Sequence, residues 1–274
     1  MSRGGKSYGD RSEYPSGPGV LRRSALLIAV SLLLSLTLTA CGQAPSEKLG
    51  VTVLGQYPHD HLAFTQGLLL HGGYLYESTG LVGMSSLRQV DLATGDVLRF
   101  RSVPAPHFAE GLELVGQELL QLTWQTGVLF RYDLQTFDLL SEQRYEGEGW
   151  GLCYDGEALW MTDGSATLFK RHVDTFEVLS SVQVKLDGNP LPRLNELECV
   201  DGKVYANVWL TDEIERIDPE SGRVEALIDA SPLRELVGIN DRDAVLNGIA
   251  YDASKDVFLV TGKLWPALFE VRFE

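Results

Sequence analysis

The segment Asn195–Trp209, NELECVDGKVYANVW, contains the pattern that decides the fold of this chain. The dipeptide DG at its centre is a strong hairpin-turn signal, and the runs on either side alternate between apolar and polar residues as strands do. Glu196, Asn207 and Trp209 lie at the end of the hairpin opposite the turn. We therefore predict an antiparallel hairpin with a polar and aromatic cluster at its open end.

This strand–turn–strand pattern recurs five times along the chain. The five copies begin FTQGLLLHGGYLYEST, FAEGLELVGQELLQLTW, GWGLCYDGEALWMTDG, LNELECVDGKVYANVW and VLNGIAYDASKDVFLVTGK. Aligned on the turn, Gly67, Gly111, Gly151, Leu197 and Gly248 are equivalent, and they are 44, 40, 46 and 51 residues apart. Further strands follow each of the first four hairpins, as in LRQVDLATGDVLRF. A period of this length with four strands per unit is typical of a β-propeller.

We therefore predict an all-β, five-bladed β-propeller. The last unit has only three strands, and Val51–Tyr57, which precedes the first hairpin, can supply the fourth. Such an N-terminal strand closes the ring and removes an open sheet edge. A β-sandwich or an open solenoid is the alternative, but a sandwich rarely has so regular a repeat.

The N-terminal segment is typical of an exported protein. Arg22-Arg23 precedes the apolar run ALLIAVSLLLSLTLTA, which ends directly before Cys41. The residues LTAC at 38–41 resemble a bacterial lipobox, which implies lipidation of Cys41 and anchoring to a membrane of the cell envelope. We predict a lipoprotein signal peptide at 1–40, the lipidated Cys41 with a tether at 41–48, and the propeller domain at 49–274. The alternatives are a plain signal peptide and a single membrane anchor.

Composition limits the partners of the chain. Lys and Arg number 23 against 38 Asp and Glu, a net charge of −15. This balance argues against nucleic acid or an anionic membrane surface as a partner. Apart from Cys41, the cysteines are Cys153 and Cys199, at the same place in two neighbouring hairpins. We expect them to be too far apart for a disulfide and to act as small buried hydrophobic residues.

Polar residues gather at the open ends of the hairpins. Counting outward from the turns predicts four cross-strand pairs: Gln66 with Glu77, Glu110 with Gln121, Trp150 with Met161, and Glu196 with Asn207. Because the first strand of every propeller blade lines the axis, we expect these clusters to converge on one mouth. Trp124, Trp150, Trp209 and Trp265 fall at the same end and predict an aromatic-walled pocket. The structural alternatives are polar pairing along a wet axis and tryptophan packing between blades.

Longer motifs resemble a known family. FTQGL, FAEGLELVG, LTWQ, GWGLCYDG, RLNELECVDGKVYANVW and VTGKLWPALFEV are similar to the plant- and bacterial-type glutaminyl-peptide cyclotransferases, and the similarity runs from about Val51 to Phe273. The resemblance implies a five-bladed propeller that converts the N-terminal glutamine of peptides to pyroglutamate with release of ammonia. It implies no cofactor and no metal. We expect the domain to be monomeric.

The resemblance also implies site residues. Glu110 of FAEGL matches the catalytic carboxylate and is expected to carry the proton, with Gln121 orienting it. Asn195 matches an active-site amide, and Lys263 matches a lysine that stabilises the oxyanion or places Glu110. The matching pocket tryptophans are Trp124, Trp150 and Trp209. Further substrate-binding or supporting candidates are Gln66, Glu77, Gln125 and Asn207.

Two other functions remain open on the sequence. A metal-dependent propeller hydrolase, such as a lactonase, holds Ca²⁺ on its axis, and Glu77, Glu196, Asn207 and Asn247 can supply oxygen ligands. Lys263 and the tryptophans fit that site poorly. The second alternative is a non-enzymatic lipoprotein that uses its propeller as a binding module.

Overall fold

Antiparallel β-strands account for nearly all regular structure in residues 45–274, the residues that the computed structural model describes. The predicted signal peptide and Cys41 lie outside the described residues. Within residues 45–274, no helix has the length and apolar character needed to cross a membrane. The strands are β1 (Glu47–Pro58), β2 (Thr65–His71), β3 (Tyr74–Thr79), β4 (Ser86–Asp91), β5 (Val97–Ser102), β6 (Ala109–Val115), β7 (Glu118–Thr123), β8 (Val128–Asp133), β9 (Leu139–Arg144), β10 (Leu152–Tyr154), β11 (Leu159–Met161), β12 (Thr167–Arg171), β13 (Val178–Gln183), β14 (Lys185–Leu186), β15 (Asn189–Pro190), β16 (Leu194–Val200), β17 (Lys203–Val208), β18 (Glu213–Asp218), β19 (Arg223–Asp229), β20 (Leu246–Asp252), β21 (Val257–Gly262) and β22 (Ala267–Phe273).

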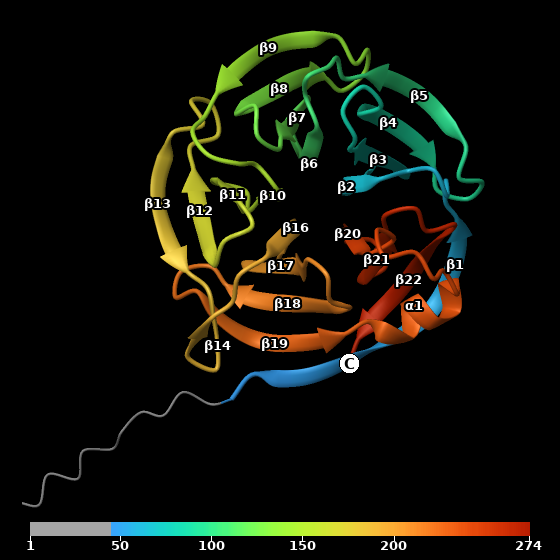
Figure 1. Cartoon of the computed structure of the whole chain (residues 1–274), viewed down its shortest axis with the longest axis vertical. Helices are drawn as coiled ribbons and strands as arrows, with labels where there is room; N and C mark the ends of the chain where they lie inside the picture. The colour runs from blue at the N-terminus through green and yellow to red at the C-terminus, as the bar shows by residue number, and fades with distance from the viewer. Residues whose placement is uncertain (1–44) are drawn as a thin grey trace, which may run out of the picture. The chain divides into compact units, whose positions relative to one another are not determined.

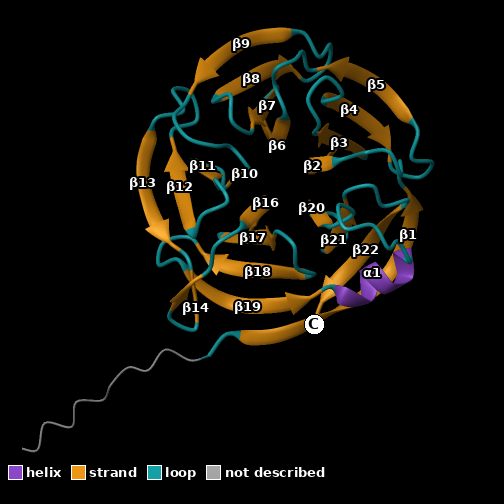
Figure 2. Ribbon diagram, viewed as in Figure 1, coloured by secondary structure: helices purple, strands orange, loops and turns teal. Residues whose placement is uncertain are grey.

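The strands form sheets arranged around a common centre (Figure 1). Three sheets have four antiparallel strands each, in the orders β2–β5, β6–β9 and β10–β13. A larger sheet has the order β16-β17-β18-β19-β1-β22-β21-β20, with the short hairpin β14–β15 attached to β19. The innermost strands are β2, β6, β10, β16 and β20, as Figure 2 also shows, and each contacts the next, with β20 returning to β2. The predicted all-β class is confirmed.

Strand β1 lies in the middle of the large sheet, between β19 and β22. Its residues 47–50 pair in parallel with β19, and its residues 51–58 pair antiparallel with β22. The strand is longer than the predicted one and begins two residues before the predicted domain boundary. The single helix of the described region, α1 (Ser231–Val237), begins with a proline in its first turn and ends at Gly238, whose φ of 67° suits glycine.

Small residues let the innermost strands approach one another closely. A Cβ on Gly67 would lie 2.4 Å from the backbone nitrogen of Leu112, and a Cβ on Gly151 would lie 2.0 Å from the backbone oxygen of Asn195. Neither contact is possible for a residue with a side chain. This explains why glycine recurs at the aligned position of the hairpins: the strands converge toward the centre, where backbone meets backbone.

The core lies between neighbouring sheets. Leu120 and Leu129 of the second sheet pack against Leu159 of the third. Leu68 of the first sheet packs against Leu259 of the large sheet, so apolar contact also joins these two sheets. Burial of these side chains stabilises the structure by roughly 1.5–3 kcal/mol each.

The predicted cross-strand pairs are wrong for Gln66, Glu110 and Trp150. The observed partners of Glu77, Gln121 and Met161 are Leu68, Leu112 and Leu152, because each turn is centred one residue later than the sequence suggested. In addition, β2, β6, β16 and β20 each carry a bulge with one extra residue near the start of the strand. In β16 the bulge contains Asn195 and Glu196, which together lie opposite Asn207. The fourth predicted pair, Glu196 with Asn207, is therefore not a regular one-to-one pair.

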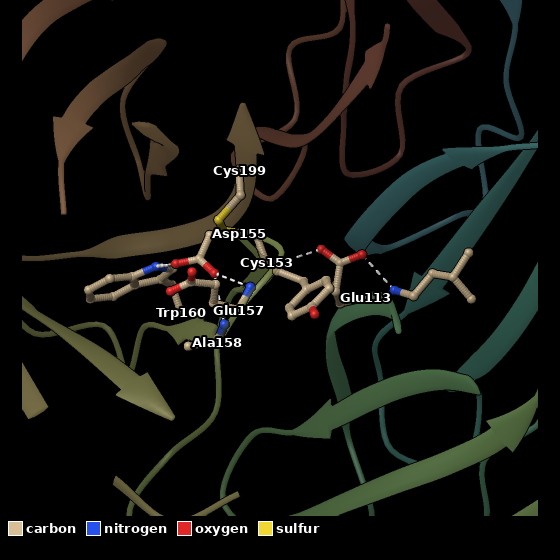
Figure 3. Close-up of a disulfide and its surroundings, with 9 residues drawn as sticks. Glu113, Cys153, Asp155, Glu157, Ala158, Trp160 and Cys199 are labelled. Carbon is tan, nitrogen blue, oxygen red and sulfur yellow. Dashed lines mark hydrogen bonds between the residues drawn. A yellow bond between two sulfur atoms is a disulfide. The ribbon is translucent and has the colours of Figure 1, made fainter. Parts of the chain in front are cut away.

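Cys153 and Cys199 form a disulfide, which contradicts the prediction that they are too far apart (Figure 3). Their Cα atoms are 5.4 Å apart, within the usual disulfide range. The bond joins β10 to β16, two adjacent innermost strands. The prediction failed because it assumed ordinary spacing between repeats, whereas the inner strands approach more closely than stacked sheets do.

Candidate active site

A cavity of about 350 Å³ opens at the ends of the innermost strands. This volume lies in the range of small-molecule sites. Its lining contains the three predicted catalytic residues Glu110, Asn195 and Lys263, which lie in β6, in β16 and directly after β21. The full lining is Phe64, Gln66, Leu81, Phe108, Glu110, Trp124, Trp150, Asn195, Trp209, Leu210, Arg242, Asp243, Val245 and Lys263.

The bulges place the polar side chains in this cavity. Gln66, Glu110 and Asn195 each lie within the extra-residue segment of their strand, where the regular alternation of side chains is interrupted. A bulge bends a strand and changes the direction in which a side chain points. Bulges at equivalent places in three strands therefore direct three polar side chains into one cavity.

Glu110 is oriented by Gln66 and not by Gln121. Gln66 Nε2 donates to Glu110 Oε1 at 3.2 Å, and Gln66 Oε1 accepts a hydrogen bond of 3.3 Å from Asn247 Nδ2. Gln121 instead donates to Ser78 Oγ at 2.8 Å, between the first and second sheets. The predicted role of Gln121 was wrong because its ladder partner is Leu112, two residues beyond Glu110.

Burial shifts the ionisation of Glu110 and Lys263 in opposite directions. Glu110 is buried, and this raises its pKa well above the ordinary value; the positive charge of Lys263 opposes the shift and the negative charge of Glu148 adds to it. Burial lowers the pKa of Lys263 to about 8, against the influence of Glu110 and Asp243. Burial thus raises the pKa of the acid Glu110 and lowers the pKa of the base Lys263, which brings the two values toward each other.

Asn195 supplies an unused hydrogen-bond acceptor. Its side chain is 2% exposed, and Oδ1 has no hydrogen-bond partner among the described residues. A buried carbonyl without a partner is costly, so this oxygen is available to accept a hydrogen bond from a bound molecule or from water. The Nζ atom of Lys263 lies 4.9 Å from the ring centroid of Phe64, within the range of a cation–π contact.

Aromatic rings form the walls. Trp150 and Trp209 pack edge to face at 5.6 Å, and Phe108 and Trp124 do so at 5.7 Å. Phe64 packs edge to face on Phe108 at 6.2 Å. The sequence analysis missed both phenylalanines, although each begins its hairpin in the motifs FTQG and FAEG.

Glu148 is a further residue that the sequence analysis missed. Its carboxylate accepts hydrogen bonds from the indole nitrogens of Trp124 and Trp150, at 2.8 and 3.0 Å. Gln125, predicted to bind substrate, instead donates to Glu148 at 3.1 Å and does not line the cavity. The segment EGEGW offers no local signal for these hydrogen bonds, since they form only where the second and third sheets meet.

Glu77 and Trp265 lie outside the cavity. Glu77 is buried 3.0 Å from His59 Nε2 and accepts a hydrogen bond of 2.7 Å from Thr65. Trp265 is fully buried and donates to the backbone oxygen of Ala244. The expectation that Trp265 contributes to the pocket wall was therefore wrong.

Glu196 and Asn207 join neighbouring sheets at the centre. The two carboxylate oxygens of Glu196 accept from the backbone nitrogens of Leu68 and Ile249, at 3.3 and 2.8 Å. Asn207 Oδ1 accepts from the backbone nitrogen of Gly248 at 3.0 Å. These side chains thus satisfy backbone N–H groups of the innermost strands β2 and β20.

The metal-site alternative finds little geometric support in residues 45–274. Among them, no group of three or more His, Cys, Asp and Glu side chains is arranged to hold a metal ion. Both oxygens of Glu196 and the oxygen of Asn207, two of the four candidate ligands, already accept backbone hydrogen bonds.

Comparison with known proteins agrees with this geometry. Residues 26–273 match the family model of glutamine cyclotransferases. The chain is 40% identical over 261 residues to the glutaminyl-peptide cyclotransferase of Arabidopsis thaliana, covering 91% of this chain and 82% of that protein. The crystal structure of Myxococcus xanthus glutaminyl cyclase superposes with a TM-score of 0.80 at 41% identity, covering 84% of this chain and 98% of the other. The chain therefore belongs to the glutamine cyclotransferase family.

Proposed function

We propose that the protein is a glutaminyl-peptide cyclotransferase. It converts an N-terminal glutamine to pyroglutamate: the α-amine attacks the side-chain carboxamide carbon, a new C–N bond forms, and the old one breaks as ammonia leaves. The observation that carries the proposal is one aromatic-walled cavity that contains Glu110, Asn195 and Lys263 together. Family membership supports the same reaction.

Glu110 moves the proton. The attacking amine must lose a proton, and the leaving nitrogen must gain one. A carboxyl group whose pKa is raised by burial can do both near neutral pH, first as base and then as acid. Gln66 holds one carboxyl oxygen, which fixes the direction in which Glu110 presents the other.

Asn195 and Lys263 bind the reacting groups. The unpaired Asn195 Oδ1 accepts an N–H from the substrate amine and turns its lone pair toward the carboxamide. Lys263, when protonated, stabilises the negative charge that develops on the carboxamide oxygen. Trp124, Trp150 and Trp209 hold the methylene stem of glutamine curled, which brings amine and carbonyl within attack distance.

Ammonia release from a short peptide that begins with glutamine tests the proposal. We expect release by the wild type, and a loss of about 10²- to 10⁴-fold in kcat/KM for Glu110→Gln. Glu142→Gln, which removes an exposed carboxylate from β9, is the matched control and should keep full activity. No release by a folded wild type would refute the proposal and favour a binding propeller, whereas release abolished by EDTA would favour a metal-dependent site.

We also propose the finer architecture and location. The domain has five blades, and β1 completes the last one; its pairing with β22 and the packing of Leu68 against Leu259 support this closure. The protein is exported as a lipoprotein, held to a membrane through Cys41, and acts as a monomer on peptides or proteins outside the cytoplasm. The apolar run before Cys41 supports the export. Mass spectrometry of membrane-extracted protein checks the acylated Cys41.

A further inference from the structure

Glu148 lies behind the tryptophan wall and does not line the candidate active site. It belongs to the segment between β9 and β10 and lines a separate cavity of about 420 Å³, together with Tyr145 and Glu146. Its Oε2 accepts from Trp124 Nε1 at 2.8 Å and from Trp150 Nε1 at 3.0 Å, while Oε1 accepts from Gln125 at 3.1 Å. One carboxylate thus binds two walls of the cavity from outside.

The two tryptophans come from different sheets. Trp124 follows β7 in the second sheet, and Trp150 precedes β10 in the third. Aromatic packing restrains the orientation of an indole, but a hydrogen bond from its N–H restrains the ring more strongly in direction. Two charge-assisted hydrogen bonds to one oxygen fix both rings in direction and relative to each other. The width of the pocket between these walls therefore depends on Glu148.

The segment that carries Glu148 is itself anchored. Gly149 donates from its backbone nitrogen to the backbone oxygen of Trp124 at 3.0 Å, and Tyr145 donates to Gly127 at 2.9 Å. A Cβ on Gly149 would lie 2.2 Å from the hydroxyl oxygen of Tyr145, so the segment packs tightly there. The carboxylate is held in place before substrate arrives, as preorganisation requires.

We propose that Glu148 is a positioning residue for the cyclisation: it clamps Trp124 and Trp150 and thereby sets the curled geometry of the substrate. The inference rests on the proposed function. A second consequence is electrostatic. The charged groups that act on Glu110 are Lys263, which favours its ionised form, and Glu148, which opposes it. The phenol of Tyr145 also lies close enough to interact with Glu110.

The charge of Glu148 persists at neutral pH. Partial burial raises its pKa, but hydrogen bonds from Trp150, Gln125 and Trp124 lower it further, and the net pKa lies below the ordinary value. Glu148 therefore holds the two tryptophans as a carboxylate anion at neutral pH.

The test compares Glu148→Gln with Glu146→Gln. Glu146 is the matched control, because it is an exposed carboxylate two residues away that lines the same outer cavity. For Glu148→Gln we expect kcat/KM to fall by at least about ten-fold, since a misplaced substrate loses its attack geometry. The limb of the pH profile governed by Glu110 should also move to lower pH, because a negative charge near it has been removed.

Indole N–H resonances report the clamp directly. In ¹H–¹⁵N spectra, the peaks of Trp124 and Trp150 should move in Glu148→Gln, while those of Trp160 and Trp265, which donate to Asp155 and Ala244, stay. If Glu148→Gln does not fold, Glu148→Asp serves, since it keeps the charge but shortens the reach; it should show a smaller loss of kcat/KM and an unmoved pH limb.

The inference would be overturned if the wild type releases ammonia and Glu148→Gln has the same kcat/KM as Glu146→Gln. Unmoved Trp124 and Trp150 peaks in Glu148→Gln would also overturn it, whether or not the wild type is active. Absence of wild-type activity alone refutes the proposed function, so the two failures are distinguishable.

Discussion

Removal of the disulfide between Cys153 and Cys199 should lower the stability of the protein substantially. The bond joins two innermost strands, β10 and β16, and the chain between its ends contains the outer strands of the third sheet. Replacing both cysteines by alanine opens this loop. The folded structure keeps the close approach of the strands, because Gly151 and not the bond permits it.

The magnitude follows from the length of the loop. The two cysteines are 46 residues apart in sequence. A cross-link over this separation reduces the entropy of the unfolded chain by about 13.5 cal/mol/K, which corresponds to about 4 kcal/mol at 25 °C. For a domain of this size, such a loss lowers Tm by about 8 to 16 °C.

Thermal unfolding followed by circular dichroism measures the effect. Four samples are compared: the wild type without and with a reductant, and Cys153→Ala/Cys199→Ala without and with the same reductant. The reduced wild type keeps the buried side chain of Cys153 and the half-buried side chain of Cys199, so it separates the cross-link from the loss of packing at Cys153. The double variant should be insensitive to reductant.

A double variant that melts within about 2 °C of the oxidised wild type would refute the reasoning. So would a wild type whose Tm does not respond to reductant while free thiols appear. Either result would mean that the bond does not constrain the unfolded chain, or that the strands do not approach as described.

Two further predictions concern ionisation. Lys263 has a pKa of about 8, and its protonated form is the active one, so kcat/KM should fall above about pH 8; Lys263→Met should lose activity at every pH and remove this alkaline limb. Glu215 is fully buried, neither carboxylate oxygen has a partner among the described residues, and burial raises its pKa to about 8. Because the folded pKa exceeds the unfolded value, the contribution of neutral Glu215 to stability is complete below about pH 4.5 and is lost as pH rises to about 8. Urea unfolding at several pH values should show this loss in the wild type, with a slope of at most about 1.4 kcal/mol per pH unit, and not in Glu215→Gln; parallel pH curves for the two proteins would contradict it.

Local pattern predicted the all-β class, and the resemblance to a known family implied the catalytic residues and the tryptophans of the cavity. Alternating strands and Asp-Gly or Gly-Gly turns depend on neighbours in sequence, so they can be recognised without a structure. Glu110, Asn195, Lys263, Trp124, Trp150 and Trp209 lie in recurring or distinctive motifs, and the structure brings them into one cavity.

Other relations depend on how separate sheets meet, and the sequence did not reveal them. The turn of the second hairpin is centred one residue later than predicted, so Gln121 pairs with Leu112, and Gln66 of the first sheet contacts Glu110 instead. Glu77 proved to be a buried structural group, because its partner His59 precedes the hairpins and has no signal in the repeat.

The sequence by itself determined the strands, their turns and the end of each hairpin that carries chemistry, because each depends on a short run of residues. Only the tertiary structure decided the disulfide, the orientation of Glu110 and the clamp at Glu148. The physical reason is common to all three. Glycine removes the side chain at the centre, neighbouring strands approach to backbone contact, and groups far apart in sequence come within bonding distance.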